Sequence, residues 1–150
     1  GIELIPATTF LDYLLPDLCH VCGPKPAKRV IEDAAFGFKI AKEVSRLDIG
    51  QTVVVKKGTV LAVEGFEGTN KAIQRGGELG RGDAVVVKVS KPNQDLRFDV
   101  PCIGPDTIEI AASSSVSAII VEANKTLLLG KNEIEISAER NGVTVYAYKE

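Results

Sequence analysis

The 150-residue chain contains no methionine and no tryptophan, and it has a single histidine. Because an initiating methionine is missing, we expect that Gly1 is not the natural start and that the sequence is a fragment. With His20 as the only histidine, catalytic sets of serine or cysteine with histidine are not serious options. Aromatic residues make up 5% of the chain, which argues against a surface that stacks nucleic-acid bases.

A strong net charge and long apolar segments are lacking as well. The 18 basic residues nearly balance the 20 acidic residues, so no positive field would attract nucleic acid, and no nucleic-acid partner is expected. No apolar run approaches the roughly 20 residues of a membrane-spanning helix, and no signal-peptide pattern occurs. The 3 cysteines are an odd number, which fits a reducing compartment better than a disulfide framework. The length and the 45% hydrophobic content fit one domain with its own core.

The hydrophobic patterning that is present predicts an α/β domain with a mixed β-sheet, hairpins and flanking helices. The expected helices begin near Thr8, at Pro26 or Ala27, at Thr69, at Pro105 and at Asn132. The expected strands are 53–55, 59–63, 84–89, 118–121, 126–129 and 143–148, with 118–121 and 126–129 forming a pair around Asn124. Residues 16–26, rich in proline and without periodicity, are interpreted as a linker. Gly37 inside the first long helix marks either close approach of another backbone or simple tolerance.

A dense group of polar residues follows the most apolar expected strand, 84–89. Two carboxylates, two cations and an amide lie within nine residues: Lys91, Gln94, Asp95, Arg97 and Asp99. Ligands of α/β sheets bind beyond the carboxyl ends of strands, and Mg²⁺ prefers a few carboxylates together with phosphate oxygens. The segment is therefore a candidate for binding a metal and a phosphate. A solvated loop whose charges pair with one another is the alternative.

A second candidate segment, Glu64–Asn70, follows an expected strand and opens an expected helix. Free backbone N–H groups and the helix dipole at such a place can receive an anion. The P-loop pattern is missing. Thr69 is also a residue type that caps helices, and this is the simpler interpretation of it.

A C-x-x-C pair, Cys19 and Cys22, encloses His20 and invites a zinc or redox interpretation. No second cysteine or histidine pair follows to complete a closed zinc site. We therefore expect that the pair has neither a metal nor a redox role.

Several segments occur together in an order and spacing that resemble one known family. They are Phe36–Phe38, Arg46–Gln51, Val60–Glu64, Glu67–Thr69, Lys91–Pro101 and Thr107. The chain resembles the carboxy-terminal domain of UDP-2,3-diacylglucosamine pyrophosphatases of the LpxI type over about residues 1–145. The K-P-x-Q-D-x-R-F-D-x-P segment is the most specific part. Asn70 departs from the family pattern, because an acid is usual there.

The resemblance implies a Mg²⁺-dependent hydrolase of Gram-negative lipid A biosynthesis. Such an enzyme splits UDP-2,3-diacylglucosamine into UMP and 2,3-diacylglucosamine 1-phosphate. The implied catalytic residues are Asp95, Asp99, Lys91, Gln94 and Arg97, with Asp95 and Asp99 as the Mg²⁺ ligands. The implied substrate-binding residues are Glu67, Gly68, Thr69, Asn70, Gln51 and Thr107.

The resemblance also implies a division into domains and a place in the cell. Residues 1–25 are interpreted as a linker and the remnant of a missing N-terminal nucleotide-binding domain, and residues 26–150 as a C-terminal catalytic-type domain. The expected location is cytoplasmic, at the inner-membrane surface through the lipid substrate, and a second copy in a homodimer is a further candidate partner. The alternative function is a non-catalytic ligand-binding or regulatory α/β domain on the same scaffold.

Overall fold

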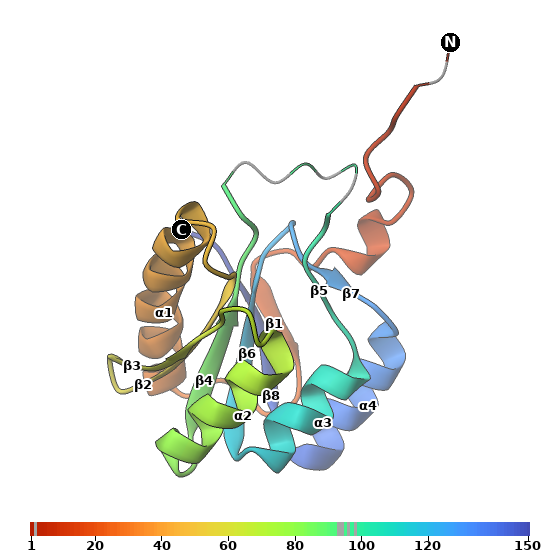
Figure 1. The fold of residues 1–150 in the computed structure, drawn as a ribbon. Coiled ribbons are helices and arrows are strands. Elements are labelled where there is room, and N and C mark those ends of the chain that lie inside the picture. Colours follow the sequence, from red (N-terminus) through yellow and green to blue (C-terminus); the bar gives the residue numbers. More distant parts are fainter. Residues whose placement is uncertain (2, 93–94, 96, 98) are drawn as a thin grey trace.

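The computed structural model describes residues 1, 3–92, 95, 97 and 99–150. These residues form a mixed six-stranded β-sheet with helices on both faces and a separate sheet of two short strands (Figure 1). The helices are η1 (3₁₀, Asp12–Leu14), α1 (Lys28–Arg46), α2 (Thr69–Gly80), α3 (Pro105–Ser113) and α4 (Lys131–Asn141). The strands are β1 (Cys19–Cys22), β2 (Thr52–Lys56), β3 (Thr59–Val63), β4 (Ala84–Lys88), β5 (Cys102–Ile103), β6 (Val116–Glu122), β7 (Leu127–Leu128) and β8 (Thr144–Tyr148). The predicted single α/β domain with a mixed sheet is confirmed.

The strand order brings several carboxyl ends to one edge of the main sheet. The order is β1-β8-β6-β4-β2-β3, in which β4, β6 and β8 are parallel neighbours. Because β2 is antiparallel to both β4 and β3, β3 runs in the same direction as β4. The strands β3, β4, β6 and β8 therefore end at one edge, which we call the carboxyl edge and which lies at the top of Figure 1.

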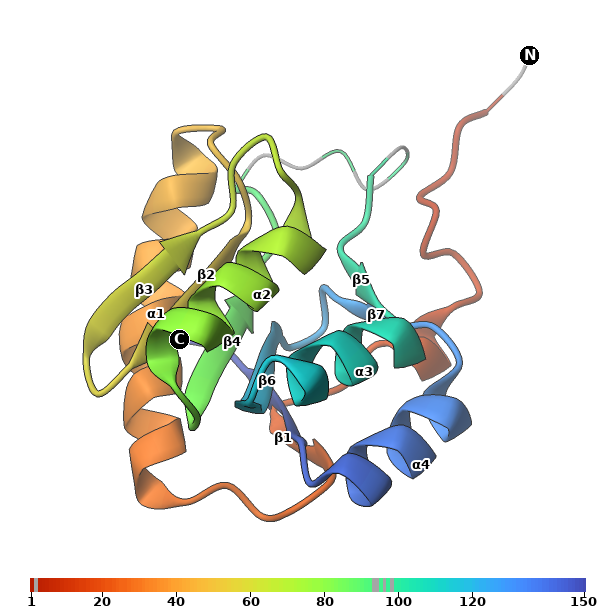
Figure 2. The ribbon, with the colours of Figure 1, turned by 60° about the horizontal axis from the view of Figure 1, so that its bottom comes forward.

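The valines of β2 and β4 alternate between two hydrophobic cores. Val54 and Val86 belong to the core beneath α2, α3 and α4, whereas Val53, Val55 and Val87 belong to the core beneath α1. Figure 2 shows α1 on one side of the sheet and the other three α-helices on the opposite side. Each buried valine stabilises the fold by about 1.5–3 kcal/mol. The strand expected at 84–89 forms as β4, which ends at Lys88 and is buried on both faces, as predicted.

Gly37 in α1 lies where the helix contacts the sheet. A Cβ atom built on Gly37 would lie 2.7 Å from Val87 Cγ2 and 3.2 Å from Val55 Cγ2. The expected close approach is therefore made by valine side chains of the sheet and not by another backbone. No helix among the described residues is both long and apolar enough to cross a membrane.

The expected pairing of 118–121 with 126–129 is wrong. Both neighbours of β6 are already taken by β4 and β8, so the next strand has no free edge to join. The chain turns at Asn124, which has a φ of 60°, and β7 instead pairs in parallel with β5 outside the main sheet.

The linker expected at 16–26 contains β1, so this interpretation is wrong for residues 19–22. β1 pairs antiparallel with β8 and supplies hydrogen-bonding partners to an otherwise open strand edge. Burial of Cys22, which is 6% exposed, adds to the core beneath α4. Whether residues 1–25 are the remnant of another domain stays a prediction.

Candidate functional site

The candidate site lies at the carboxyl edge, where charged residues lie at the ends of three strands. Glu64 follows β3, Lys88 ends β4 and Glu122 ends β6. Each of these side chains is mostly buried, with residue exposures of 9%, 9% and 4%. Such groups need hydrogen-bonding partners because a buried charge without partners is strongly destabilising.

Thr69 links Glu64 and Lys88 through its hydroxyl group. The hydroxyl donates to Glu64 Oε1 across 2.8 Å and accepts a hydrogen bond of 3.2 Å from Lys88 Nζ. The backbone N–H of Gln51 donates to the other oxygen of Glu64 across 3.3 Å. We call Gln51, Glu64, Thr69 and Lys88 the Thr69 cluster. Among the described residues Lys88 makes no ion pair, since the Thr69 hydroxyl stands between it and Glu64.

The sequence suggested that Thr69 is the N-cap of α2. This is wrong, because the Thr69 hydroxyl donates to Glu64 instead. The N-cap is Gly68, whose φ of 82° favours glycine, and it makes no side-chain capping bond. The first turn contains no acidic residue. The N–H groups of this turn and the positive end of the helix dipole lie at the start of α2, to which Thr69 belongs, and a helix start of this kind suits an anion.

Lys91 opens the polar loop and forms an ion pair with Asp48, an acid that the sequence analysis did not single out. The hydrogen bond and the charge of Asp48 raise the pKa of Lys91, and the charges of Asp99 and Glu64 act in the same direction. Lys91 is therefore a protonated cation at the start of the polar loop. Its catalytic role stays a prediction.

Asp95 and Arg97 form a bidentate pair within the loop. Arg97 Nε donates to Asp95 Oδ1 across 2.8 Å, and Nη2 donates to Oδ2 across 2.6 Å. These hydrogen bonds lower the pKa of Asp95 to about 2. The N–H of Asp99 donates to the Asp95 carbonyl oxygen across 3.1 Å. Gln94, the remaining predicted catalytic residue, lies outside the described residues.

The other predicted substrate-binding residues divide into two groups. Gly68, Thr69 and Gln51 lie at the Thr69 cluster. Glu67 instead forms an ion pair with Arg75 of α2, and the Arg75 hydrogen bond lowers the pKa of Glu67. Thr107 accepts a hydrogen bond of 3.4 Å from the Gly104 N–H at the start of α3, where it acts as a local cap, and Asn70 is exposed on α2.

The cysteine pair is split between two environments. Cys19 is exposed, while burial, and secondarily the negative charges of Glu135 and Glu139, raises the pKa of Cys22 to about 11. His20 Nε2 lies 2.9 Å from the Gly23 carbonyl oxygen. Cys22 is thus a protonated thiol, which is a poor metal ligand and a poor nucleophile.

A family model described as the LpxI C-terminal domain matches residues 18–146. The chain belongs to this family. It is 37% identical over 128 residues to the UDP-2,3-diacylglucosamine pyrophosphatase LpxI of Caulobacter vibrioides, and the match covers 80% of this chain and 46% of that relative. The chain therefore spans about half the length of the curated relative that it matches. The predicted resemblance to the LpxI family is confirmed.

The residues of this LpxI C-terminal domain suit Mg²⁺ by their donor chemistry. Among the described residues no group of three histidine, cysteine or acidic side chains is arranged around a common point. Mg²⁺ is commonly held by only one or two carboxylates, with water and phosphate oxygens completing its shell. Asp95 and Asp99 supply such hard oxygen donors, and Arg97 has to share or release the Asp95 carboxylate for a cation to bind.

Sequence reasoning about this LpxI domain did not single out Lys88 and Glu122, and it named Glu64 only within the candidate segment Glu64–Asn70. One signal marks all three, because each is a charged residue that immediately follows a run of four aliphatic residues. The runs are Val60–Val63, Ala84–Val87 and Ala118–Val121. A charge at that place must either reach solvent or meet a partner at the end of the sheet.

Proposed function

We propose that this domain carries the phosphate-binding and metal-binding part of a hydrolase for UDP-2,3-diacylglucosamine. The reaction gives UMP and 2,3-diacylglucosamine 1-phosphate in lipid A biosynthesis. Family membership and the name of the Caulobacter relative support this substrate. The single observation that carries the proposal is the buried Lys88, held by Thr69 beside the uncapped first turn of α2.

The chemistry of diphosphate cleavage depends mainly on positioning and on neutralising negative charge. Lys88 and the first-turn N–H groups of α2 bind one phosphoryl group, and Lys91 approaches it from the polar loop. Glu64 keeps the Thr69 hydroxyl turned towards itself, so Thr69 presents an oxygen to Lys88 and orients the ammonium group. These residues require no histidine.

Asp95 and Asp99 would hold Mg²⁺ next to this phosphate site. Mg²⁺ held there would polarise the phosphoryl group and lower the pKa of a bound water. Arg97 keeps Asp95 ionised and thus able to bind a cation. In this assignment Asp95 and Asp99 are both metal ligands, and Arg97 keeps the Asp95 carboxylate ionised.

The location that we propose is the cytoplasm, at the inner-membrane surface, where the lipid substrate would be met. A nucleotide-binding domain holds the uridine part, and the substrate lies between that domain and the carboxyl edge. A homodimer is compatible with this arrangement. Remote binding energy from the nucleotide then aligns the diphosphate with Lys88 and Lys91.

Release of UMP from UDP-2,3-diacylglucosamine in the presence of Mg²⁺ tests the proposal. Asp95→Asn should lower kcat at least about 100-fold, since a Mg²⁺ ligand is lost. Asp83→Asn is the matched control, because Asp83 forms an exposed pair with Arg29 at the opposite edge of the sheet, and it should leave kcat unchanged. Binding of substrate without turnover in the parent would instead support the ligand-binding or regulatory alternative.

A further inference from the structure

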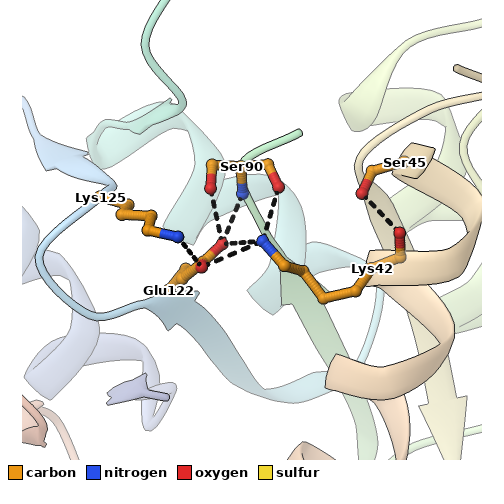
Figure 3. A network of polar contacts seen from close by, with 5 residues as sticks. All are labelled: Lys42, Ser45, Ser90, Glu122 and Lys125. Carbon is orange, nitrogen blue, oxygen red and sulfur yellow. Dashed lines mark hydrogen bonds and ion pairs between the residues drawn. The ribbon is translucent and has the colours of Figure 1, made fainter. Parts of the chain in front are cut away.

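The carboxyl edge contains a second polar network, beside the Thr69 cluster and centred on Glu122. Its side chain is 5% exposed and accepts hydrogen bonds from three residues (Figure 3). Ser90 donates both its backbone N–H and its hydroxyl to Glu122 Oε2, each across 2.8 Å. Because Ser90 directly precedes Lys91, these bonds fix the point at which the polar loop leaves the sheet.

Lys42 of α1 closes the network from the other side. Its ammonium group donates to Glu122 Oε2 across 2.9 Å and to the carbonyl oxygen of Ser90, also across 2.9 Å. All three polar groups of Ser90 are therefore bound. Figure 3 shows Lys42 and Lys125 on opposite sides of the Glu122 carboxylate, with Ser90 above it. Lys125 donates to Glu122 Oε1 across 2.8 Å.

The turn that begins at Glu122 also contacts the far end of the polar loop. The N–H groups of Lys125 and Thr126 donate to the Glu122 carbonyl oxygen across 3.3 and 3.2 Å. The next residue, Leu127, donates its N–H to the Pro101 carbonyl oxygen across 2.9 Å. One short segment, 122–127, thus binds the loop where it begins, at Ser90, and where it ends, at Pro101.

We propose that Glu122 is a positioning residue that sets the placement of Lys91, and with it the start of the loop that carries Asp95 and Asp99, through its side-chain bonds at Ser90. The inference rests on the proposed function for the role of those three residues. Glu122 itself does not touch the substrate. Its four side-chain hydrogen bonds to Ser90 and Lys42 act on the loop, and its backbone carbonyl orders the turn that reaches Pro101.

A merely structural carboxylate in the same domain provides the control. Asp33 in α1 is 3% exposed and accepts hydrogen bonds from the N–H groups of Lys57 and Gly58, across 2.9 and 2.8 Å. It therefore fixes the β2–β3 hairpin just as Glu122 fixes the polar loop. This hairpin lies at the edge opposite the carboxyl edge.

The experiment compares Glu122→Gln with Asp33→Asn in the complete protein that contains this chain. Kinetics of UDP-2,3-diacylglucosamine hydrolysis and amide hydrogen exchange at Ser90 are measured together. Glu122→Gln should lower kcat about 10- to 100-fold with KM changed less than about threefold, because a small misplacement of reacting groups has effects of this size. It should also speed exchange at Ser90. Asp33→Asn should speed exchange at Gly58 and leave kcat and Ser90 unchanged.

The outcomes separate this inference from the proposed function. If the parent hydrolyses the substrate and Glu122→Gln keeps its kcat, the inference is overturned while the function stands. If the parent does not hydrolyse the substrate, the function fails, and the inference is overturned with it because the loop then has no catalytic residues to place. Equal losses of kcat in the two variants would mean that stability alone is at work. Should Glu122→Gln fail to fold, Ser90→Ala removes only the hydroxyl bond, and a lower kcat at unchanged KM is again expected.

Discussion

The Lys88 ammonium group and the Glu64 carboxylate do not touch, because the Thr69 hydroxyl lies between them and hydrogen-bonds to both. A direct ion pair would have neutralised the buried lysine. The intervening hydroxyl holds the ammonium group in place while leaving its other N–H groups for a ligand. A phosphate is the ligand that this arrangement fits, given the uncapped first turn of α2 beside it.

Replacement of Lys88 tests this interpretation directly. Lys88→Met should weaken binding of glucosamine 1-phosphate about 10- to 100-fold, the effect of losing one charge-assisted hydrogen bond. Isothermal titration calorimetry measures the change. Lys56→Met is the matched control, since Lys56 also ends a strand but binds the Gly80 and Gly82 carbonyl oxygens at the opposite edge. Equal affinities of the parent and the Lys88 variant would refute the phosphate site.

Glu122 should make the domain sensitive to acid. Burial would raise its pKa, but hydrogen bonds from Lys125, Ser90 and Lys42 outweigh burial and hold the pKa below its ordinary value. The stabilisation is therefore complete above the pKa of an unfolded glutamate and is lost as the pH falls through the lower pKa of the folded state. Urea unfolding between pH 7 and pH 3 measures this loss.

In the variant Glu122→Gln the free energy of unfolding should depend less on pH than in the parent. At pH 7 it should lower the free energy of unfolding by about 3–5 kcal/mol, as expected when one partner of a buried ionic network is removed. As the pH falls through the lowered pKa of folded Glu122, the difference from the parent should shrink, because the parent carboxylate then loses its charge. A constant difference at all pH values would contradict the pKa assignment.

Gly37 should not tolerate a methyl group. Alanine gains about 1 kcal/mol of helix propensity over glycine, but overpacking against Val87 and Val55 opposes this by about 1–3 kcal/mol. We expect Gly37→Ala to lower the melting temperature. Gly65→Ala is the control, since a Cβ there would meet no atom closer than 3.7 Å. A more stable Gly37→Ala protein would mean that the helix shifts away from the sheet easily.

The three cysteines should react at different rates with iodoacetamide. Cys19 and Cys102 are exposed, whereas Cys22 is buried with a pKa raised to about 11. At pH 8 peptide mapping should find Cys19 and Cys102 labelled first and Cys22 labelled only after unfolding. Replacing Cys19 and Cys22 together by serine should leave hydrolysis intact. Rapid labelling of Cys22 in the folded protein would reopen a redox role.

The long, periodic elements could be predicted from the sequence. The strands that form only because of contacts with distant residues could not. The valine runs at 53–55 and 85–87 predict buried strands, because the signal comes from the side chains of these residues themselves. The strand at 19–22 forms because β8 has an open edge, and the two-residue strands β5 and β7 form because they meet each other. None of these conditions is visible in the local residues.

The candidate site was likewise predictable only in part. The loop that carries Lys91, Asp95 and Asp99 could be found from its composition and its place after a buried strand. The contacts of the loop could not be predicted, because its partners come from other parts of the chain. Lys91 pairs with Asp48, and the neighbouring Ser90 donates to Glu122. Thr69 shows the same limit. The sequence suggests a helix cap, whereas in the structure its hydroxyl hydrogen-bonds to both Glu64 and Lys88.

The pairing of β1 with β8 has a consequence for how the protein forms during translation. His20 aligns with Tyr146, so the first strand of the sheet pairs with the last one made. At ribosomal speeds of about 5–20 residues per second, roughly 6–25 seconds pass between the synthesis of His20 and that of Tyr146. Such non-local pairing is intrinsically slow to form. The sheet of this domain is therefore completed only after its last strand has left the ribosome.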